Sequence, residues 1–286
     1  MIALRSLLFI PGNKANMLEK ALGFKPDVFV PDMEDSVPKS EKENARNLIS
    51  EYLPKLAESG VPIIPRVNSL DTTWAVDDLA AVVGPHIYGV SIGKINTPAD
   101  IKETSEHLCA LERKAGLNEG HIKMIPWLES AKAIIHCYEI CLASERLVGI
   151  AFGGEDFTHD MGIERLEDES EVSFARNQLC IAARAAEVLA LDTPYFLFKD
   201  EDGLRINSAA AKQCGFKGKF AIHPAQINGI NDTFSPSKKE IEYAHRVVQA
   251  FEEAERAGRG STSLDGKVID VPVVKRARAL LDLASR

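Results

Sequence analysis

Residues 124–133 read MIPWLESAKA, and residues 147–160 read LVGIAFGGEDFTHD. Each stretch contains an apolar run typical of a buried strand, and an acid follows soon after each run, Glu129 in the first and Asp156 in the second. A carboxylate inside such a run would be buried without a partner, so both acids are expected at the rim of a parallel sheet. Carboxylates over adjacent strand ends can share a divalent cation that keeps several waters, as magnesium prefers. The alternative for Glu129 is that it only begins the next helix, where an acid interacts favourably with the helix dipole.

The same pattern extends along most of the chain. Short apolar, β-branched runs alternate with longer amphipathic stretches, which predicts alternating strands and helices. The predicted strands are 6–10, 27–31, 61–66, 87–93, 122–127, 147–152, 194–198 and 219–222. Helices are expected over 40–56, 98–115, 130–142, 171–189 and 203–214.

The number and character of these strands favour a closed barrel. Near-continuous apolar runs, such as Val28-Phe29-Val30, indicate strands that are buried on both faces, and eight strand–helix units are the number that closes a (β/α)8 barrel. An open doubly wound sheet is the competing fold, but no GxGxxG loop follows the first strand. We therefore predict an α/β fold, a (β/α)8 TIM barrel over 1–258 with a short C-terminal extension over 259–286.

Composition limits the partners of the chain. Its 286 residues carry a net charge of −8, which argues against nucleic-acid binding and against binding to anionic membranes. A small-molecule partner is favoured. The five cysteines form no CxxC pair and are odd in number, so no disulfides and a reducing compartment are expected. The first apolar run is too short for a signal peptide and no stretch approaches the length of a membrane span, so we expect a cytoplasmic protein.

Polar residues recur just after the predicted strands. In strand order they are Asn13; Asp32, Glu34 and Asp35; Arg66 and Asn68; Lys94; Glu129; Glu155 and Asp156; Lys199; and His223. Because the carboxyl ends of barrel strands meet at one face, we expect these side chains to converge on a single pocket.

Roles within this pocket follow from residue chemistry. Asp32, Glu34 and Asp35 cannot all bind one metal directly, because their mutual repulsion would raise their pKa values, so we expect them to orient other ligands. Arg66 is suited to clamp a carboxylate or to stabilise an oxyanion, although it could instead pair with one of these acids. In the segment Gly153-Gly154-Glu155, free N–H groups could bind an anionic end of the substrate, or the glycines could simply form a turn.

Several motifs resemble the HpcH/HpaI aldolase and citrate lyase superfamily, in particular its citrate lyase β-subunit-like, or CoA-ester lyase, branch. The similar stretches cover nearly the whole chain: RSLLFIPGN from residue 5, DMEDSV from 32, PRVN from 65, GGED from 153, KFAIHPAQI from 219 and DGKVIDVP from 265. Pro31 and the pair Gly93-Lys94 depart from the pattern, but neither is one of the proposed metal acids.

This resemblance implies magnesium, with manganese as an alternative, on Glu129 and Asp156. It further implies that Arg66 is catalytic and contacts the substrate beside the metal. The expected reaction is the reversible cleavage of a β-hydroxyacyl-CoA, such as malyl-CoA or citramalyl-CoA, into a 2-oxo acid and acetyl-CoA.

The resemblance also assigns the tail. Asp270 is expected to complete the active site of a neighbouring subunit in a homotrimer or hexamer, as the group that transfers the proton at the thioester's α-carbon; from the residues alone it reads as a helix cap. CoA enters as part of the substrate. Its phosphates need cations at the mouth of the pocket, and Arg5 and Lys14, beside the end of the first strand, are the expected contacts. His223 lines the cofactor site or is structural.

Other functions remain open at this level. A class II pyruvate aldolase without CoA typically lacks the tail motif. A malyl-CoA thioesterase, and a citrate lyase β subunit that acts on a citryl thioester of an acyl-carrier protein, share the same motifs. A catalytically silent scaffold subunit is disfavoured because Arg66, Glu129, Asp156 and Asp270 are all present.

Overall fold

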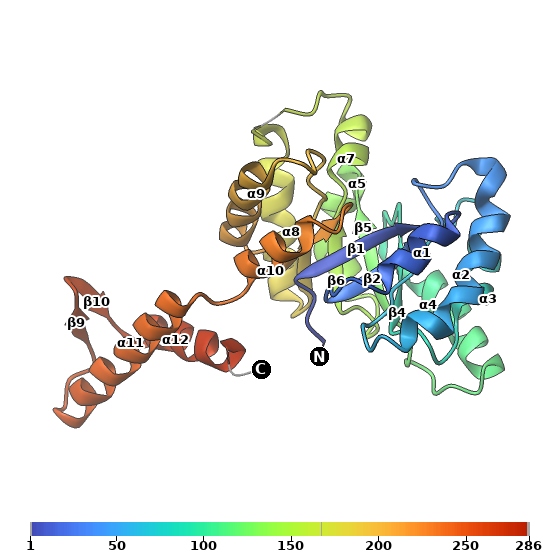
Figure 1. Ribbon diagram of the computed structural model, residues 1–286. Helices are drawn as coiled ribbons and strands as arrows, with labels where there is room; N and C mark the ends of the chain where they lie inside the picture. Colours follow the sequence, from blue (N-terminus) through green and yellow to red (C-terminus); the bar gives the residue numbers. More distant parts are fainter. Residues whose placement is uncertain (1, 167, 285–286) are drawn as a thin grey trace. The chain divides into compact units, whose positions relative to one another are not determined.

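Eight parallel strands close into a barrel in the computed structural model, which describes residues 2–166 and 168–284 (Figure 1). The strands are β1 (Ser6–Pro11), β2 (Val28–Asp32), β3 (Arg66–Val67), β4 (Gly89–Ile92), β5 (Lys123–Leu128), β6 (Gly149–Phe152), β7 (Leu189–Asp192) and β8 (Gly218–Ala221). Each strand pairs with the next in chain order, and β8 pairs with β1 with Phe220 opposite Leu7. The predicted α/β barrel is confirmed.

Helices connect the strands. They are α1 (Ala15–Ala21), α2 (Lys42–Ala57), α3 (Ala75–Val82), α4 (Pro98–Lys114), α5 (Ala131–Ile135), α6 (Cys137–Cys141), α7 (Gly154–Met161), α8 (Ser173–Ala185), α9 (Glu201–Cys214) and α10 (Gln226–Phe234), with 3-10 turns at Lys39–Glu41 and Ser170–Val172. Local sequence explains several of their starts. For example, Thr97 and Asp100 form a capping box around Pro98 at the first turn of α4.

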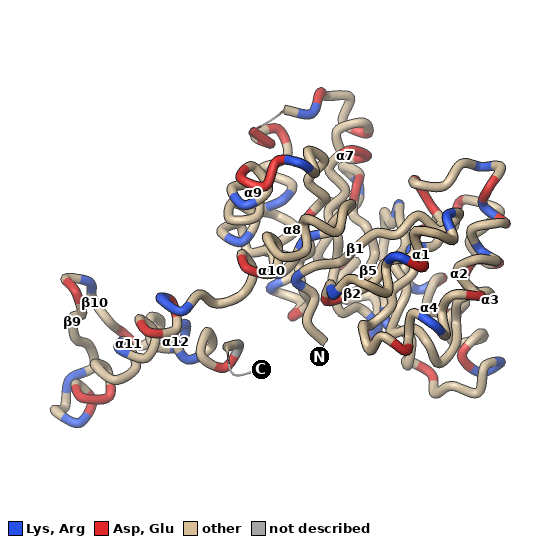
Figure 2. The backbone as a smooth tube through the Cα atoms, viewed as in Figure 1, with Lys and Arg blue, Asp and Glu red and all other residues tan. Residues whose placement is uncertain are grey.

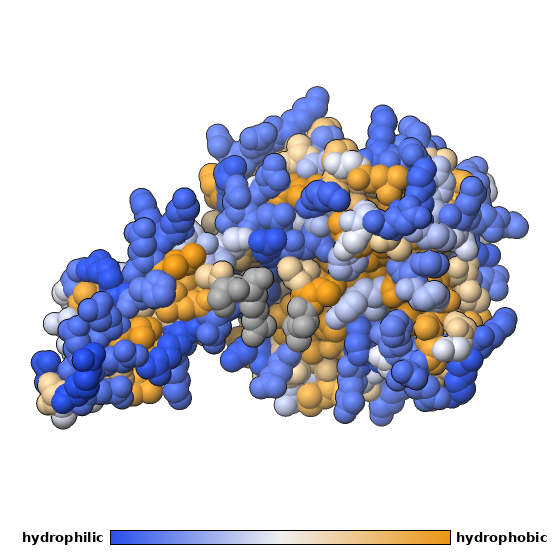
Figure 3. Space-filling view, turned by 60° about the horizontal axis from the view of Figure 1, so that its bottom comes forward, coloured by the Kyte–Doolittle hydropathy of each residue, from blue (hydrophilic) through white to orange (hydrophobic). Residues whose placement is uncertain are grey.

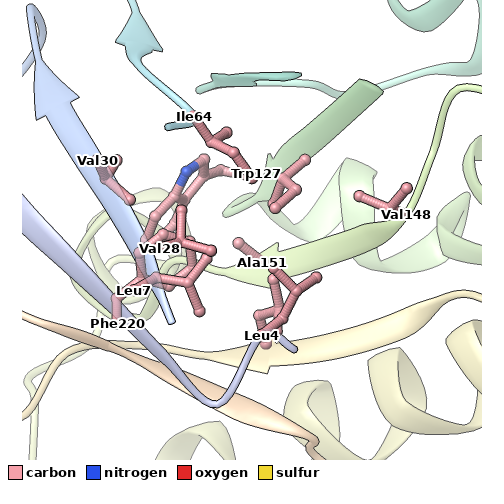
Figure 4. Close-up of a cluster of buried hydrophobic side chains, with 11 residues drawn as sticks. Leu4, Leu7, Val28, Val30, Ile64, Trp127, Val148, Ala151 and Phe220 are labelled. Carbon is pink, nitrogen blue, oxygen red and sulfur yellow. The ribbon is translucent and has the colours of Figure 1, made fainter. Parts of the chain in front are cut away.

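The barrel interior is filled by apolar side chains that alternate along the strands. Leu7, Val28, Ile64, Trp127 and Phe220 belong to one buried cluster, drawn as sticks in Figure 4. Phe220 and Trp127 lie with ring centroids 4.4 Å apart. This packing fixes which strand positions face inward, and therefore which side chains reach the carboxyl-end face.

The seventh strand was predicted at the wrong place. The structure puts β7 at Leu189–Asp192, whereas the predicted 194–198 is a loop in which Phe196 and Leu197 are 52% and 63% exposed. Leu and Ala are good helix formers, so the preceding helix was predicted to run to Leu189, residues 190–193 were assigned to neither element, and the aromatic run that follows was predicted as a strand. As a result, Lys199 lies in this loop rather than at the end of β7.

The third strand is shorter than predicted. Only Arg66–Val67 are assigned to β3, with an isolated bridge between Phe29 and Ile63. Pro62 and Pro65 have no N–H group to donate to a neighbouring strand, which limits regular pairing over 61–65.

The C-terminal residues form a second compact unit, over 231–286, separate from that of 1–230. It contains α11 (Lys238–Arg256), a hairpin of β9 (Thr262–Leu264) and β10 (Lys267–Ile269), and α12 (Val271–Ala284). Asp265 and Gly266 turn the hairpin with φ of 48° and 74°, as an Asp-Gly pair does in a two-residue hairpin loop. Helix α11 therefore belongs to the second unit, whereas the predicted barrel domain, 1–258, included it.

The second unit has a small core of its own. Val247, Phe251, Ile269 and Val274 are buried in it, while Val268 is 70% exposed. Figure 3 shows hydrophobic residues at the surface of this unit among hydrophilic ones. Among the described helices, none combines the length and the apolar composition that crossing a membrane requires.

Candidate active site

A pocket of about 380 Å³ opens at the carboxyl ends of the strands. It brings together the predicted site residues Asp32, Asp35, Arg66, Glu129, Gly153, Gly154, Glu155 and Asp156. Acidic positions, red in Figure 2, mark the helix α7 that carries Glu155 and Asp156. The predicted convergence on one pocket is therefore present for part of the set. The residues that were expected there but do not line the pocket are Asn13, Glu34, Asn68, Lys94, Lys199 and His223.

Glu129 directly follows β5 and is held in a narrow space. Glu129 is only 6% exposed, and its Oε1 accepts a hydrogen bond of 2.7 Å from the N–H of Lys94. Lys94 has a left-handed backbone, φ 58°, which few residues other than glycine adopt. On the other side, a Cβ added at Gly153 would lie 2.3 Å from Glu129 Oε2, so only glycine leaves room for the carboxylate.

Glu34 lies beside Glu129. A Cβ added at Gly93 would lie 2.5 Å from Glu34 Oε1 and 3.2 Å from Glu129 Oε1, so the two carboxylates flank the same glycine. Glu34 Oε1 is buried and accepts no hydrogen bond from the described residues. A buried carboxylate oxygen without a partner is costly, so its position next to a second acid indicates a site for a cation.

The electrostatics of the two acids point the same way. Burial raises the pKa of Glu129 to about 8, and the charges of Glu34 and Asp156 add to the rise. Burial also raises the pKa of Glu34 to about 7, with Arg66 opposing the rise and Asp35 and Asp32 adding to it. The positive charge already nearby, chiefly Arg66, does not offset burial and the neighbouring acids, and a bound cation would add to it.

These residues fit a divalent metal held by few protein ligands. In the parts of the chain that the structure describes, no group of three or more His, Cys, Asp or Glu side chains is already arranged around a single metal position. Magnesium commonly takes one or two carboxylates and several waters, which Glu129 and Asp156 can provide with Glu34 nearby. A complete protein cage is not required.

The affinity for magnesium is expected to rise with pH. Glu129 and Glu34 hold protons near neutral pH because their pKa values are raised, and a metal binds the deprotonated carboxylates. We expect the affinity to increase by up to about tenfold per pH unit for each displaced proton between about pH 6 and 8. Titration calorimetry in buffers of different ionisation enthalpy measures that proton release. Glu34→Gln should reduce the number of protons released when magnesium binds. An affinity for magnesium that stays constant over this pH range would contradict the prediction.

Arg66 enters the pocket from β3 with its guanidinium already paired. Its Nε and NH2 donate to the two carboxylate oxygens of Asp32 at 2.7 and 2.8 Å, and NH1 lies 3.0 Å from Glu34 and 3.2 Å from Asp35. Although burial alone raises the pKa of Asp32, the charge and hydrogen bonds of Arg66 outweigh it and lower that pKa overall. The fork is thus rigidly oriented, as a group that must meet a substrate oxygen in one geometry needs to be.

An aromatic floor beneath Arg66 was not identified from the sequence. The guanidinium carbon lies 4.5 Å from the ring centre of Phe9 and 5.6 Å from that of Trp127. Trp127 lies on β5 two residues before Glu129, which directly follows the strand, so the period of two along a strand predicts that both face inward. That periodicity is the signal that could have located this floor.

The segment Gly153–Glu155 differs from the expectation of free N–H groups. Gly153 N donates to Leu128 O at 3.4 Å, and Gly154 N donates to the hydroxyl of Thr193 at 3.4 Å. Glu155 forms an ion pair of 3.1 Å with Arg165. Gly153 therefore provides space for Glu129, and substrate contacts from this segment remain a prediction.

The expected CoA contacts are divided between the two ends of the barrel. Arg5 precedes β1 and lies at its amino end, where it pairs with Asp27 at 2.8 Å, so the prediction that it sits at the pocket mouth is wrong. The prediction put Arg5 at the carboxyl end of the first strand, whereas it precedes β1 at the amino end. Lys14, in contrast, is exposed just after β1, and the His223 ring lies 5.0 Å from that of Phe198 after β8.

Asp270 lies in the second unit, immediately before α12. Its Oδ1 accepts a hydrogen bond of 3.2 Å from the N–H of Val273, so it caps this helix. The residue is partly buried, and its other carboxylate oxygen has no role in the cap. The interpretation of Asp270 as a helix cap, made from the residues alone, is thus correct, while its catalytic role stays a prediction.

Comparison with known proteins agrees with this geometry. Residues 5–224 match the model of the HpcH/HpaI aldolase/citrate lyase family. Citrate lyase subunit beta of Haemophilus influenzae is 38% identical over 280 residues, covering 98% of this chain and 96% of that protein. A (3S)-malyl-CoA thioesterase of Cereibacter sphaeroides is 36% identical over 278 residues, covering 97% and 93%. These matches confirm the resemblance that the motifs indicated.

A solved structure is similar over the whole chain. It is that of CitE from Mycobacterium tuberculosis in complex with magnesium, acetoacetate and coenzyme A, with 27% identity, a TM-score of 0.82 and 99% of each chain covered. The similarity includes both compact units of the present chain, because the matched share leaves almost no residue outside it.

Proposed function

Because this chain belongs to the HpcH/HpaI aldolase/citrate lyase family, a family of lyases, we propose that it is a magnesium-dependent carbon–carbon lyase acting on a CoA thioester. The reaction is the reversible cleavage of a β-hydroxyacyl-CoA, such as malyl-CoA or citramalyl-CoA, into a 2-oxo acid and acetyl-CoA. The observation that carries this proposal is the pair of buried acids, Glu129 and Glu34, next to the Arg66 fork.

The two halves of the substrate need different groups. Magnesium, when bound by Glu129 and Asp156, supplies Lewis-acid stabilisation of negative charge on the oxygen that becomes the carbonyl of the 2-oxo acid. Arg66 donates hydrogen bonds to the same half of the substrate from its fixed position on Asp32. Phe9 and Trp127 close the pocket beneath the guanidinium and keep water from that side.

The other half needs a proton at the α-carbon of the thioester. When the carbon–carbon bond breaks, the substrate hydroxyl loses its proton to solvent as its oxygen becomes the carbonyl, and the electrons of the broken bond pass to the α-carbon. A proton from a carboxylic acid must then be delivered to this carbon to give acetyl-CoA. We assign this step to Asp270 of a neighbouring subunit, in a homotrimer or hexamer. A carboxylate next to an apolar thioester can exchange such a proton.

A panel of thioesters tests the proposal directly. Malyl-CoA, citramalyl-CoA and hydroxymethylglutaryl-CoA are incubated with the protein and magnesium. Release of the oxo acid, a 2-oxo acid from the first two and a 3-oxo acid from the third, is measured separately from release of free CoA thiol. Oxo-acid release from a CoA ester supports the proposal. Thiol release without oxo acid would indicate a thioesterase, and turnover of free 4-hydroxy-2-oxo acids alone would indicate an aldolase.

The citrate lyase β relatives favour a second candidate. At 38% identity over 98% of this chain, they support action on a citryl thioester of an acyl-carrier protein. The same panel separates the two, provided that it includes citryl-CoA and a citryl thioester on a carrier protein. A preference of more than about tenfold in kcat/KM for the carrier-bound substrate would favour this candidate.

Complementation tests the shared active site. If Asp270 acts in a neighbouring barrel, mixing the inactive Asp270→Asn and Arg66→Ala proteins restores activity. After random exchange of subunits, about one quarter of the active sites then contain both Arg66 and Asp270. The measurement is oxo-acid release after subunit exchange, which is confirmed by mass spectrometry. Mixing Arg66→Ala with Asp156→Ala is the control, since both residues line the same barrel pocket. Exchange without recovery would contradict the proposal that Asp270 acts in the barrel of a neighbouring subunit.

A further inference from the structure

Lys42 is a buried lysine behind the pocket. It opens α2, is 6% exposed, and its Nζ donates to the carbonyl oxygens of Met33 at 2.8 Å and Glu34 at 2.7 Å. The ring centre of Trp74 lies 5.7 Å from the same Nζ. Lysine is rarely buried so deeply, and its hydrogen bonds go to main-chain carbonyls instead of a carboxylate. Such a contact holds the backbone of the residues that it touches.

The two carbonyls belong to the peptide groups on either side of the Glu34 Cα atom. When both peptide planes are held by one ammonium, the direction of the Glu34 side chain is largely determined. That direction places Glu34 Oε1 beside Glu129, across Gly93. Lys42 thus acts on the acid pair without touching the pocket.

Other contacts hold the rest of this acidic turn, residues 32–36. The carboxylate of Asp32 accepts hydrogen bonds from the N–H groups of Glu34 at 2.9 Å and Ser36 at 3.2 Å. Asn68 Nδ2 adds a second hydrogen bond, of 2.9 Å, to the Met33 carbonyl. Glu34 O, however, receives its side-chain hydrogen bond from Lys42. The same oxygen also accepts a hydrogen bond of 2.9 Å from the N–H of Val37. Loss of the ammonium would therefore leave each of the two carbonyls with another partner, but would remove the one group that links them.

We propose that Lys42 is a positioning residue that fixes Glu34 against Glu129 and thereby sets the affinity of the pocket for its divalent cation. The effect on turnover rests on the proposed lyase function, whereas the effect on metal binding does not. A purely structural lysine would stabilise the fold and leave the affinity of the folded protein for metal unchanged. The two roles are therefore separable by measuring metal binding in folded variants.

The test uses Mn²⁺ as the probe, since its paramagnetism reports free and bound ion directly. Lys42→Met removes both hydrogen bonds at nearly constant size, and we expect it to weaken Mn²⁺ binding by about tenfold or more, as loss of an orienting contact behind a metal ligand does. Lys42→Arg keeps a charged donor in reach of both carbonyls and should restore binding to within about threefold of wild type. Lys39→Met, an exposed lysine just before α2, is the matched control and should bind like wild type.

Each outcome decides the proposal. Wild-type Mn²⁺ affinity in folded Lys42→Met would overturn it. If that variant does not fold, Lys42→Gln takes its place, and failure of both to fold would also overturn it, because Lys42 would then be a stability residue. Weakened Mn²⁺ binding without turnover of any thioester by the wild type would support the role of Lys42 while refuting the proposed lyase function.

Discussion

Alanine in place of Asp156 is expected to abolish magnesium-dependent turnover while the barrel stays folded. Asp156 lies near the amino end of α7 at the pocket surface, so its removal creates no cavity in the core. The lost Lewis-acid stabilisation is worth several kcal/mol, which corresponds to a fall in kcat of about a thousandfold or more. Steady-state kinetics at saturating magnesium measure the loss, and circular dichroism checks the fold.

An exposed acid elsewhere on the barrel provides the control for Asp156. Glu103→Ala, on α4, removes the same charge from an exposed residue that does not line the pocket. It should leave kcat within about twofold of wild type. If Asp156→Ala kept more than about a tenth of wild-type kcat, the assignment of Asp156 as a metal ligand would be wrong.

Replacement of Arg66 is expected to lower both activity and stability. Arg66→Ala leaves the buried carboxylate of Asp32 without its two-pronged partner, and breaking a buried pair in this way costs about 3 to 5 kcal/mol. Loss of the hydrogen bonds that we propose it donates to the substrate should lower kcat by about a hundred- to a thousandfold. Denaturant unfolding and steady-state kinetics give the two numbers separately.

Arg66→Lys separates the two effects. A lysine keeps the positive charge beside Asp32 but lacks the planar fork, so we expect stability to recover in large part and kcat to stay low. Arg113→Lys, in an exposed ion pair with Glu119, is the control and should change neither quantity. Recovery of full activity in Arg66→Lys would show that charge alone suffices and that the fork geometry is not needed.

The sequence predicted the barrel because its strands are buried on both faces and read as short apolar runs. That signal failed at residues 189–198, where Leu-Ala-Leu continues a helical pattern and an exposed aromatic loop imitates a strand. Burial, which distinguishes β7 from the loop, depends on packing that a local pattern does not contain. Prolines explain the shortened β3, and that effect was readable from the sequence.

The site was predictable where a residue lies at the carboxyl end of its strand or directly after it. Glu129 and Arg66 were placed in the pocket in this way, and the structure brings them together. Arg5 was not, because adjacency to a strand in sequence does not say which end of the barrel the residue occupies. Lys42 carried no signal, since its contacts to the carbonyls of Met33 and Glu34 depend on how α2 packs behind the acidic turn.

The glycines beside Glu129 make the pocket vulnerable to the smallest possible change. Gly153 has φ −100° and ψ 94°, a backbone that alanine also adopts. The obstacle to a methyl group there is the Glu129 side chain, whose Oε2 would lie 2.3 Å and whose Cβ would lie 2.6 Å from it. One added carbon atom would displace Glu129 without altering any charge in the protein. Gly153→Ala is thus the natural route to an inactive enzyme that keeps the native electrostatics, suitable for trapping an uncleaved thioester.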